Sequence, residues 1–243
     1  MPSSGFFYHA VTMNGRTDVP GSQREVQLLH LLCRVFGCQS ELAEQIRSRG
    51  RLRDYRMRAL LLRAGDPVST LFVMVSGVAH AIVYSIQGQP VLLHEYVAGD
   101  CFGAVGASAQ ARHEADVLAV VDVASFLLDG GELTLLAERH GCIGLALLRL
   151  MIERLQRTET RMYQHAAISA VGRVHAELLR RARENRDLTI RPAPVLSDLA
   201  LRVSTSRETV SRAVNALERR GIVRRTADEL VVVAPHRLEE LVV

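Results

Sequence analysis

The 243-residue sequence predicts an α+β protein with an N-terminal antiparallel β-roll, one long helix and a C-terminal winged helical domain. Three patterns carry this prediction. Short apolar segments separated by turn residues occupy about residues 55–128, which is typical of antiparallel strands. An apolar repeat with alternating steps of three and four follows over about 142–168. An amphipathic helix with a strongly polar face covers about 205–221.

The composition is that of an ordinary folded protein. Apolar residues make up 48% of the chain and charged residues 23%, which allows two domains with cores of their own. All thirty basic residues are arginine, whose planar fork suits phosphate and guanine contacts. Cys33, Cys38, Cys101 and Cys142 follow no disulfide spacing, and no signal peptide or long apolar run is visible. We therefore expect reduced thiols, no membrane segment and a cytoplasmic location.

The N-terminal part is expected to form a flexible arm and a roll with flanking helices. Residues 1–22 are largely polar and are assigned to the arm, and residues 23–140 to an effector-type roll domain. Two short helices are expected between residues 23 and 50. Strands are expected at 60–63, 71–75, 78–84, 91–96 and 117–128, with a short helix at 131–139.

A long helix over residues 141–168 is predicted to dimerise the protein. Its apolar positions repeat every seven residues, as in a coiled coil. The predicted seam consists of Leu148, Met151, Leu155, Thr158, Met162 and His165. We expect a homodimer, although a helix packed on its own domain would have similar spacing.

Residues 169–243 are predicted to form a winged helix-turn-helix domain. Helices are expected at 170–183, 196–203 and 236–241, and the two strands of a wing at 222–225 and 230–233. The helix at 205–221 is expected to start with a capping box formed by Thr205 and Glu208 and to stop at Gly221. Its buried stripe is predicted to be Val210, Ala213, Val214 and Leu217.

The opposite face of this helix predicts a DNA-recognition surface. It carries Arg207, Glu208, Ser211, Arg212 and Asn215. Arg207 and Arg212 can donate to guanine O6 and N7, and Glu208 can accept from cytosine N4. Ser211 can bond a base edge or lie beside a thymine methyl group. The expected phosphate contacts, which fix register without reading sequence, are Ser206 and Thr209.

The order of roll, long helix and helix-turn-helix resembles the Crp/Fnr superfamily of bacterial transcription regulators. The string Ser-Arg-Glu-Thr-Val-Ser-Arg at 206–212 is the most specific match, and segments 65–66 and 99–103 are similar to turns of the family's roll. The resemblance implies a homodimer on double-stranded DNA, a palindromic site with TTG-type half-sites, and RNA polymerase as a partner if the protein is an activator. It also places Ser204 where the family has glycine, so an uncommon backbone conformation is expected there.

The effector region departs from the pattern of the family's cyclic-nucleotide-binding members. Those members have a glutamate that binds the ribose and an arginine that binds the phosphate. Here Ala104 replaces the acid, and His113 stands at the arginine position with Glu114 after it. The other candidate pocket residues are Gly103, Val105, Arg112, Thr158 and Glu159. We expect no ordinary cyclic AMP or cyclic GMP binding, and instead another ligand or none.

The sequence gives little support for other cofactors or for catalysis. Cys33 and Cys38 are only a pair, whereas an iron–sulfur cluster in this family needs four cysteines, so neither a cluster nor another metal site is expected. Haem stays open, since possible axial ligands are His80, His94, His113 and His165. No nucleophile–base set or phosphate loop is visible, so no enzyme is expected. The alternatives are a ligand-binding module that acts through a protein partner, and a cyclic-nucleotide-responsive regulator with an altered pocket.

Overall fold

The computed structural model describes residues 21–86, 88–104 and 112–242. The chain divides into two compact units, one that ends at Thr160 and one that begins at Arg161. Nearly all of the expected arm at 1–22, and Val105 of the candidate pocket, lie outside the described residues. Among the described helices, none combines the length and apolar character needed to cross a bilayer.

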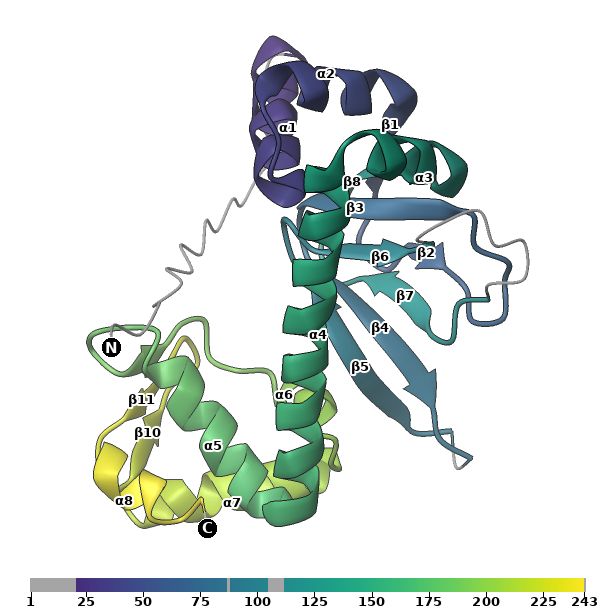
Figure 1. Ribbon diagram of the computed structural model, residues 1–243. Helices are drawn as coiled ribbons and strands as arrows, with labels where there is room; N and C mark the ends of the chain where they lie inside the picture. Colours follow the sequence, from purple (N-terminus) through teal and green to yellow (C-terminus); the bar gives the residue numbers. More distant parts are fainter. Residues whose placement is uncertain (1–20, 87, 105–111, 243) are drawn as a thin grey trace. The chain divides into compact units, whose positions relative to one another are not determined.

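The first unit contains a β-roll made of two four-stranded antiparallel sheets (Figure 1). Its strands are β1 (Gly50–Tyr55), β2 (Leu60–Leu62), β3 (Thr70–Ser76), β4 (Ala79–Tyr84), β5 (Pro90–Tyr96), β6 (Cys101–Gly103), β7 (Asp116–Ala119) and β8 (Val123–Asp129). One sheet has the strand order β1-β8-β3-β6 and the other β2-β7-β4-β5. The α+β class and the antiparallel roll are confirmed.

The strands differ from the expected ones at three places. One is β6, which was not expected, because three residues give no periodic pattern and only the pairing with β3 makes them a strand. The segment 117–128 is two strands rather than one, because the chain turns at 120–122, where Asp122 Oδ1 accepts a hydrogen bond from the Met57 N–H at 2.8 Å. Apolar residues on both sides of that turn make the segment look continuous. β1 was not expected, because Arg51 and Arg53 interrupt its apolar pattern. It is an edge strand, paired only with β8, so its arginines remain in water.

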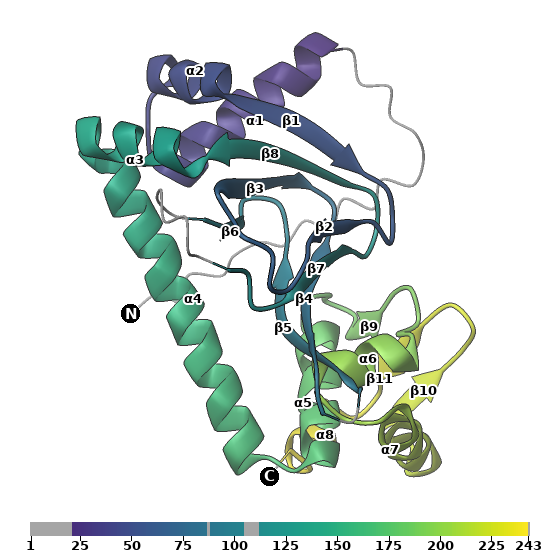
Figure 2. The same ribbon diagram turned by 90° about the vertical axis from the view of Figure 1, so that its right-hand side faces the viewer.

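Helices cover one of the two sheets of the roll. They are α1 (Gly21–Phe36), α2 (Ser40–Arg49), α3 (Gly130–Arg139) and the first turns of α4 (Gly141–Ala167). Leu32, Phe36 and Ile46 are at most 1% exposed and pack with the β3 and β8 side chains Leu71 and Leu128. In both views α1, α2 and α3 lie beside β1, β8 and β3 (Figures 1 and 2). The two expected N-terminal helices and the helix after the roll are confirmed.

The second unit is a small helical domain with a three-stranded antiparallel sheet. Its elements are α5 (Ala170–Ala182), β9 (Thr189–Ile190), α6 (Leu196–Arg202), α7 (Arg207–Arg219), β10 (Val223–Arg225), β11 (Leu230–Val232) and α8 (Pro235–Glu239). The sheet order is β10-β11-β9. The expected wing hairpin is therefore β10 and β11, whereas β9 was not expected. Two residues are too few to produce a periodic pattern, and only the pairing with β11 makes them a strand.

The expected capping box of α7 is wrong by one residue. The Thr205 N–H donates to the Ala200 carbonyl at 3.0 Å, so Thr205 belongs to the turn after α6. The cap is Ser206, whose Oγ accepts from the Thr209 N–H at 3.2 Å. The end of the helix is as expected, because Gly221 follows it with φ of +65°.

The turn between α6 and α7 has the expected uncommon conformation at Ser204. Its φ is +49°, which is the left-handed region that side chains with a Cβ rarely adopt. The peptides on both sides are held, because the Ser204 N–H donates to the Leu201 carbonyl at 3.3 Å and the Thr205 N–H to the Ala200 carbonyl. The surrounding turn therefore imposes a conformation that glycine would adopt at lower cost.

Replacing Ser204 with glycine is expected to raise the free energy of unfolding of the second unit by about 0.5–1 kcal/mol. Relief of the left-handed strain outweighs the added freedom of the unfolded chain. Urea unfolding followed by circular dichroism measures the change. The matched control is Thr205→Gly, at a neighbouring position without positive φ, which should lower stability. A Ser204→Gly variant no more stable than the parent would contradict this account.

Candidate nucleic-acid interface and effector region

The apolar stripe of α7 anchors the helix in the second unit. Val210, Ala213, Val214 and Leu217 are at most 4% exposed, as the sequence predicts. They belong to one core with side chains of α5, α6 and the sheet. Because this face is buried, the opposite face must be turned outward. Exposed side chains on it are Arg207, Glu208, Arg212 and Asn215, and Ser211 is half-buried.

Local hydrogen bonds orient the polar side chains at the start of α7. Hydrogen bonds from its own backbone amide and from the Ser206 hydroxyl lower the pKa of Glu208, so this side chain is a charged acceptor at neutral pH. Arg212 Nε donates to the Glu208 carbonyl at 3.3 Å, which leaves the two terminal nitrogens of its fork to donate elsewhere. Ser206 Oγ accepts from the Thr209 N–H and lies 3.1 Å from Thr209 Oγ1.

Arg173 ties the turn before α7 to α5. Its Nε donates to the Val203 carbonyl at 3.0 Å, and one terminal nitrogen donates to the Ser204 carbonyl at 3.4 Å. The other terminal nitrogen donates to the Ile168 carbonyl at 2.9 Å. Guanidinium donors thereby satisfy three carbonyls that follow the ends of helices. The sequence pattern did not point to this role; the only signal was an arginine beside the buried Val174.

The interior of the roll is occupied by its own aromatic side chains. Phe72, Tyr96 and Phe102 are 4%, 1% and 3% exposed. The Phe72 and Phe102 rings stack with centroids 4.9 Å apart, and the Tyr96 and Phe102 rings with centroids 4.5 Å apart. Ala104, two residues after Phe102, is buried, and its N–H donates to the Thr70 carbonyl at 3.0 Å. Aromatic side chains from three strands, β3, β5 and β6, thus pack together inside the roll.

Gly103 has a backbone reason to be glycine. Its φ is +100°, and a Cβ at this position would lie 2.2 Å from the Thr70 carbonyl oxygen. No other residue fits so close to a neighbouring strand in that conformation. The candidate pocket residue is therefore required by the strand pairing of β6 with β3.

Three of the other candidate pocket residues bond backbone carbonyls, and the remaining two are exposed. An Arg112 terminal nitrogen donates to the Gly65 carbonyl at 2.6 Å, and the His113 Nδ1 lies 2.5 Å from the Ala115 carbonyl. Glu114 is exposed. On α4, Thr158 Oγ1 donates back to the Arg154 carbonyl at 2.9 Å. Thr158 and Glu159 are both exposed.

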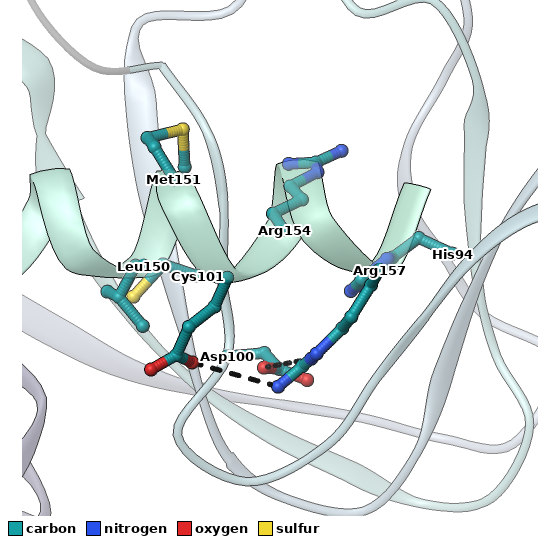
Figure 3. Close-up of a pocket in the computed structure, with 8 residues that line it drawn as sticks. His94, Asp100, Cys101, Leu150, Met151, Arg154 and Arg157 are labelled. Carbon is teal, nitrogen blue, oxygen red and sulfur yellow. Dashed lines mark ion pairs between the residues drawn. The ribbon is translucent and has the colours of Figure 1, made fainter. Parts of the chain in front are cut away.

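A small pocket lies between the β5–β6 turn and α4 (Figure 3). Its lining residues are His94, Asp100, Cys101, Leu150, Met151, Glu153, Arg154 and Arg157. Its volume of about 20 Å³ has room for about one water molecule. In Figure 3, Arg157 of α4 extends toward Asp100, with 3.7 Å between their charged atoms. Arg154 donates to the Tyr96 hydroxyl at 3.2 Å, so both arginines join α4 to the roll.

Burial raises the pKa of several groups in and near this pocket. It raises the pKa of Asp100, against hydrogen bonding from the Val97 N–H and the charge of Arg157. It also raises the pKa of Cys101 to about 12. Burial, with the thiols of Cys33 and Cys142 nearby, raises the pKa of Cys38 to about 11. Thiols with such values remain protonated at neutral pH and are poor nucleophiles.

Three of the four histidines considered for haem, His80, His94 and His113, have other contacts in the roll. His80 Nε2 lies 2.9 Å from Glu95 Oε2. The His94 ring packs on Tyr96 with centroids 4.6 Å apart. Over the described residues, no group of three or more His, Cys, Asp or Glu side chains is placed to hold a metal ion.

Comparisons with known proteins match both units. Residues 52–140 match the cyclic nucleotide-binding domain family, and residues 172–241 match the Crp-like helix-turn-helix domain family. The chain is 24% identical over 188 residues to Vfr, a cAMP-activated global transcriptional regulator of Pseudomonas aeruginosa. That alignment covers 74% of this chain and 88% of Vfr.

Solved structures share the fold at low sequence identity. CLP from Xanthomonas campestris, a c-di-GMP-responsive global regulator, is 20% identical with a TM-score of 0.70, over 80% of this chain and 99% of CLP. A variant of CooA from Carboxydothermus hydrogenoformans is 18% identical with a TM-score of 0.70, over 82% of this chain and 90% of that chain. FixK2 from Bradyrhizobium japonicum is 21% identical with a TM-score of 0.65, over 79% of this chain and 96% of that chain. With the two domain matches in this order, the chain belongs to the Crp/Fnr family of DNA-binding transcription regulators.

Proposed function

We propose that the protein is a homodimeric regulator that reads a palindromic DNA site with α7. The observation that carries this proposal is the polar face of α7, which stands outward because the other face is buried. Helix-turn-helix proteins insert the N-terminal end of this helix into the major groove. In that position Arg207 and Arg212 donate to guanine, and Glu208 accepts from cytosine. Ser211 contacts a base edge or a thymine methyl group.

The remaining features of DNA binding follow from the same placement. The hydroxyls of Ser206 and Thr209, at the start of α7, contact phosphates and set the register. Two copies related by a two-fold axis require a palindrome with half-site centres about 34 Å apart. The similarity of 206–212 to the Fnr side of the family favours TTG-type half-sites. RNA polymerase is the further partner if the protein acts as an activator.

Dimerisation is assigned to α4. Leu148, Leu155 and Met162 are 56%, 58% and 68% exposed and follow one another at seven-residue intervals. The rest of the proposed seam, Met151, Thr158 and His165, is also exposed. A second copy of α4 would cover this stripe in a coiled coil. In this proposal, residues 23–140 are the effector-type domain, 141–168 the dimerisation helix and 169–243 the DNA-binding domain.

The effector pocket is proposed to be degenerate. Ala104 offers no acid for a ribose hydroxyl, and the roll interior is filled by Phe72, Tyr96 and Phe102. The Arg112 guanidinium is bonded to the Gly65 carbonyl. These features favour a different small molecule or no effector. The second candidate, a cyclic-nucleotide-responsive regulator with an altered pocket, is favoured by the match of residues 52–140 to the cyclic nucleotide-binding domain family.

Arg207→Ala and Arg212→Ala are each expected to weaken binding of a palindromic duplex with TTG half-sites by about 1–3 kcal/mol. Each variant should also lose its preference at one base pair of the half-site, because a bidentate guanine contact is removed. Fluorescence anisotropy with duplexes substituted at single positions measures both effects. Arg183→Ala, which removes an exposed arginine paired with Glu239, is the control and should bind normally. Unaltered binding by both α7 variants would point instead to docking on a protein partner.

Leu155→Glu is expected to convert the dimer to monomers, because it places a charge in the centre of the proposed seam. Sedimentation equilibrium measures the mass of the particle. DNA affinity should fall as the dimer is lost. Leu135→Glu makes the same change at an exposed leucine of α3 and should leave the dimer intact. A Leu155→Glu protein that stays dimeric would show that α4 is not the dimer interface.

Cyclic AMP and cyclic GMP are expected to leave the thermal unfolding of the full-length chain unchanged. A ligand at about 100 times its Kd would stabilise the folded state by about 2.7 kcal/mol, a shift of several degrees that differential scanning fluorimetry detects. Cyclic di-GMP is included as a third ligand, and a bound DNA duplex confirms that the protein can respond. Stabilisation by micromolar cyclic AMP would contradict the proposal of a degenerate pocket and favour a cyclic-nucleotide-responsive regulator.

A further inference from the structure

Asn215 continues the outward face of α7 beyond the proposed base contacts. It lies four residues after Ser211 and seven after Glu208, so the three side chains share one side of the helix. Asn215 is exposed, yet it is not free to rotate. A terminal nitrogen of Arg225, on wing strand β10, donates to the Asn215 Oδ1 at 3.3 Å.

The chemistry of Arg225 decides how Asn215 is oriented. A guanidinium has only donors, so the amide atom that faces it must be the oxygen. The amide nitrogen then points away from the wing with hydrogens to donate. An asparagine that reads adenine needs both amide atoms, as acceptor and as donor. The bond from Arg225 orients the amide, so Asn215 presents its amide N–H groups as donors on the side away from the wing.

The place of Asn215 along α7 decides what it can reach. It is eight residues after Arg207, which is about 12 Å along the helix axis. The N-terminal turns of a recognition helix contact bases, and later turns recede toward the sugar–phosphate backbone. A side chain in the third turn that presents amide donors therefore fits a phosphate oxygen.

We propose that Asn215 donates to a DNA phosphate and that Arg225 is the positioning residue for this contact. Arg225 is itself held, because Glu218 Oε2 lies 3.5 Å from the same terminal nitrogen. Its backbone is paired with Leu230 of β11 in the wing hairpin. The wing thus sets the orientation of a side chain on α7. The inference rests on the proposed placement of α7 in the major groove.

Two substitutions of Asn215 test the phosphate contact in the full-length chain. The probe is a duplex selected from random sequences by the unaltered protein, together with versions changed at single base pairs. Asn215→Ala should weaken binding about three- to tenfold, equally on every version, because a phosphate carries no sequence information. Asn215→Asp should keep the contact with Arg225, so its Tm should not fall. It should bind DNA more weakly than Asn215→Ala, because a carboxylate then faces a phosphate.

A double-mutant comparison tests the positioning role of Arg225. Arg225→Ala should lower affinity about as much as Asn215→Ala and add little when both changes are combined. Arg183→Ala is the control, since it removes an exposed arginine that is paired with Glu239 and should leave DNA affinity near normal. The Asn215→Asp variant keeps the wing contact, so it remains informative if Arg225→Ala fails to fold.

Three results would overturn the inference. One is loss of preference at a single base pair in Asn215→Ala, which would mean base reading. Another is normal binding by both Asn215 variants while Arg212→Ala has lost binding; this leaves the proposed role of α7 standing. The third is a salt slope reduced by about one in Arg225→Ala with no effect of Asn215→Ala, which would make Arg225 the phosphate contact.

Discussion

The burial of one face of α7 is the constraint on which the proposed DNA-binding surface depends. Val210, Val214 and Leu217 are at most 1% exposed, so the helix cannot rotate without exposing the core of its unit. That fixed rotation determines which side chains face outward. The turn before the helix is fixed as well, because Arg173 bonds the carbonyls of Val203 and Ser204. The apolar contacts of the buried face of α7 therefore position the polar side chains that are proposed to enter the DNA groove.

Apolar packing also determines the interior of the roll. Its interior is packed with Phe72, Tyr96 and Phe102, and two arginines of α4 bond groups at its edge. Apolar packing of this kind stabilises the roll without a ligand. Any molecule that entered would have to displace these side chains or occupy another part of the domain.

The wing gives α7 a second support, which the family pattern alone would not suggest. A hairpin next to a recognition helix is usually considered for its own DNA contacts. Here Arg225 of the hairpin bonds Asn215 and Glu218 of α7, so its position affects the helix surface. The residues proposed to read bases lie in the first two turns of α7, whose apolar face is buried in the core. In the third turn, Asn215 is oriented by Arg225 of the wing.

Local patterns determined much of this protein from the sequence alone. The apolar stripe of α7, its stop at Gly221, the backbone at Ser204 and the length of α4 depend on neighbours a few residues away, so spacing and turn chemistry predict them. The cap at Ser206 was missed, because the Ala200 carbonyl removes Thr205 from that role. Strand β9 exists only through its pairing with β11. The aromatic stack of the roll and the bond from Arg225 to Asn215 join different elements. Tertiary structure decided these features, since no local pattern records which distant side chains meet.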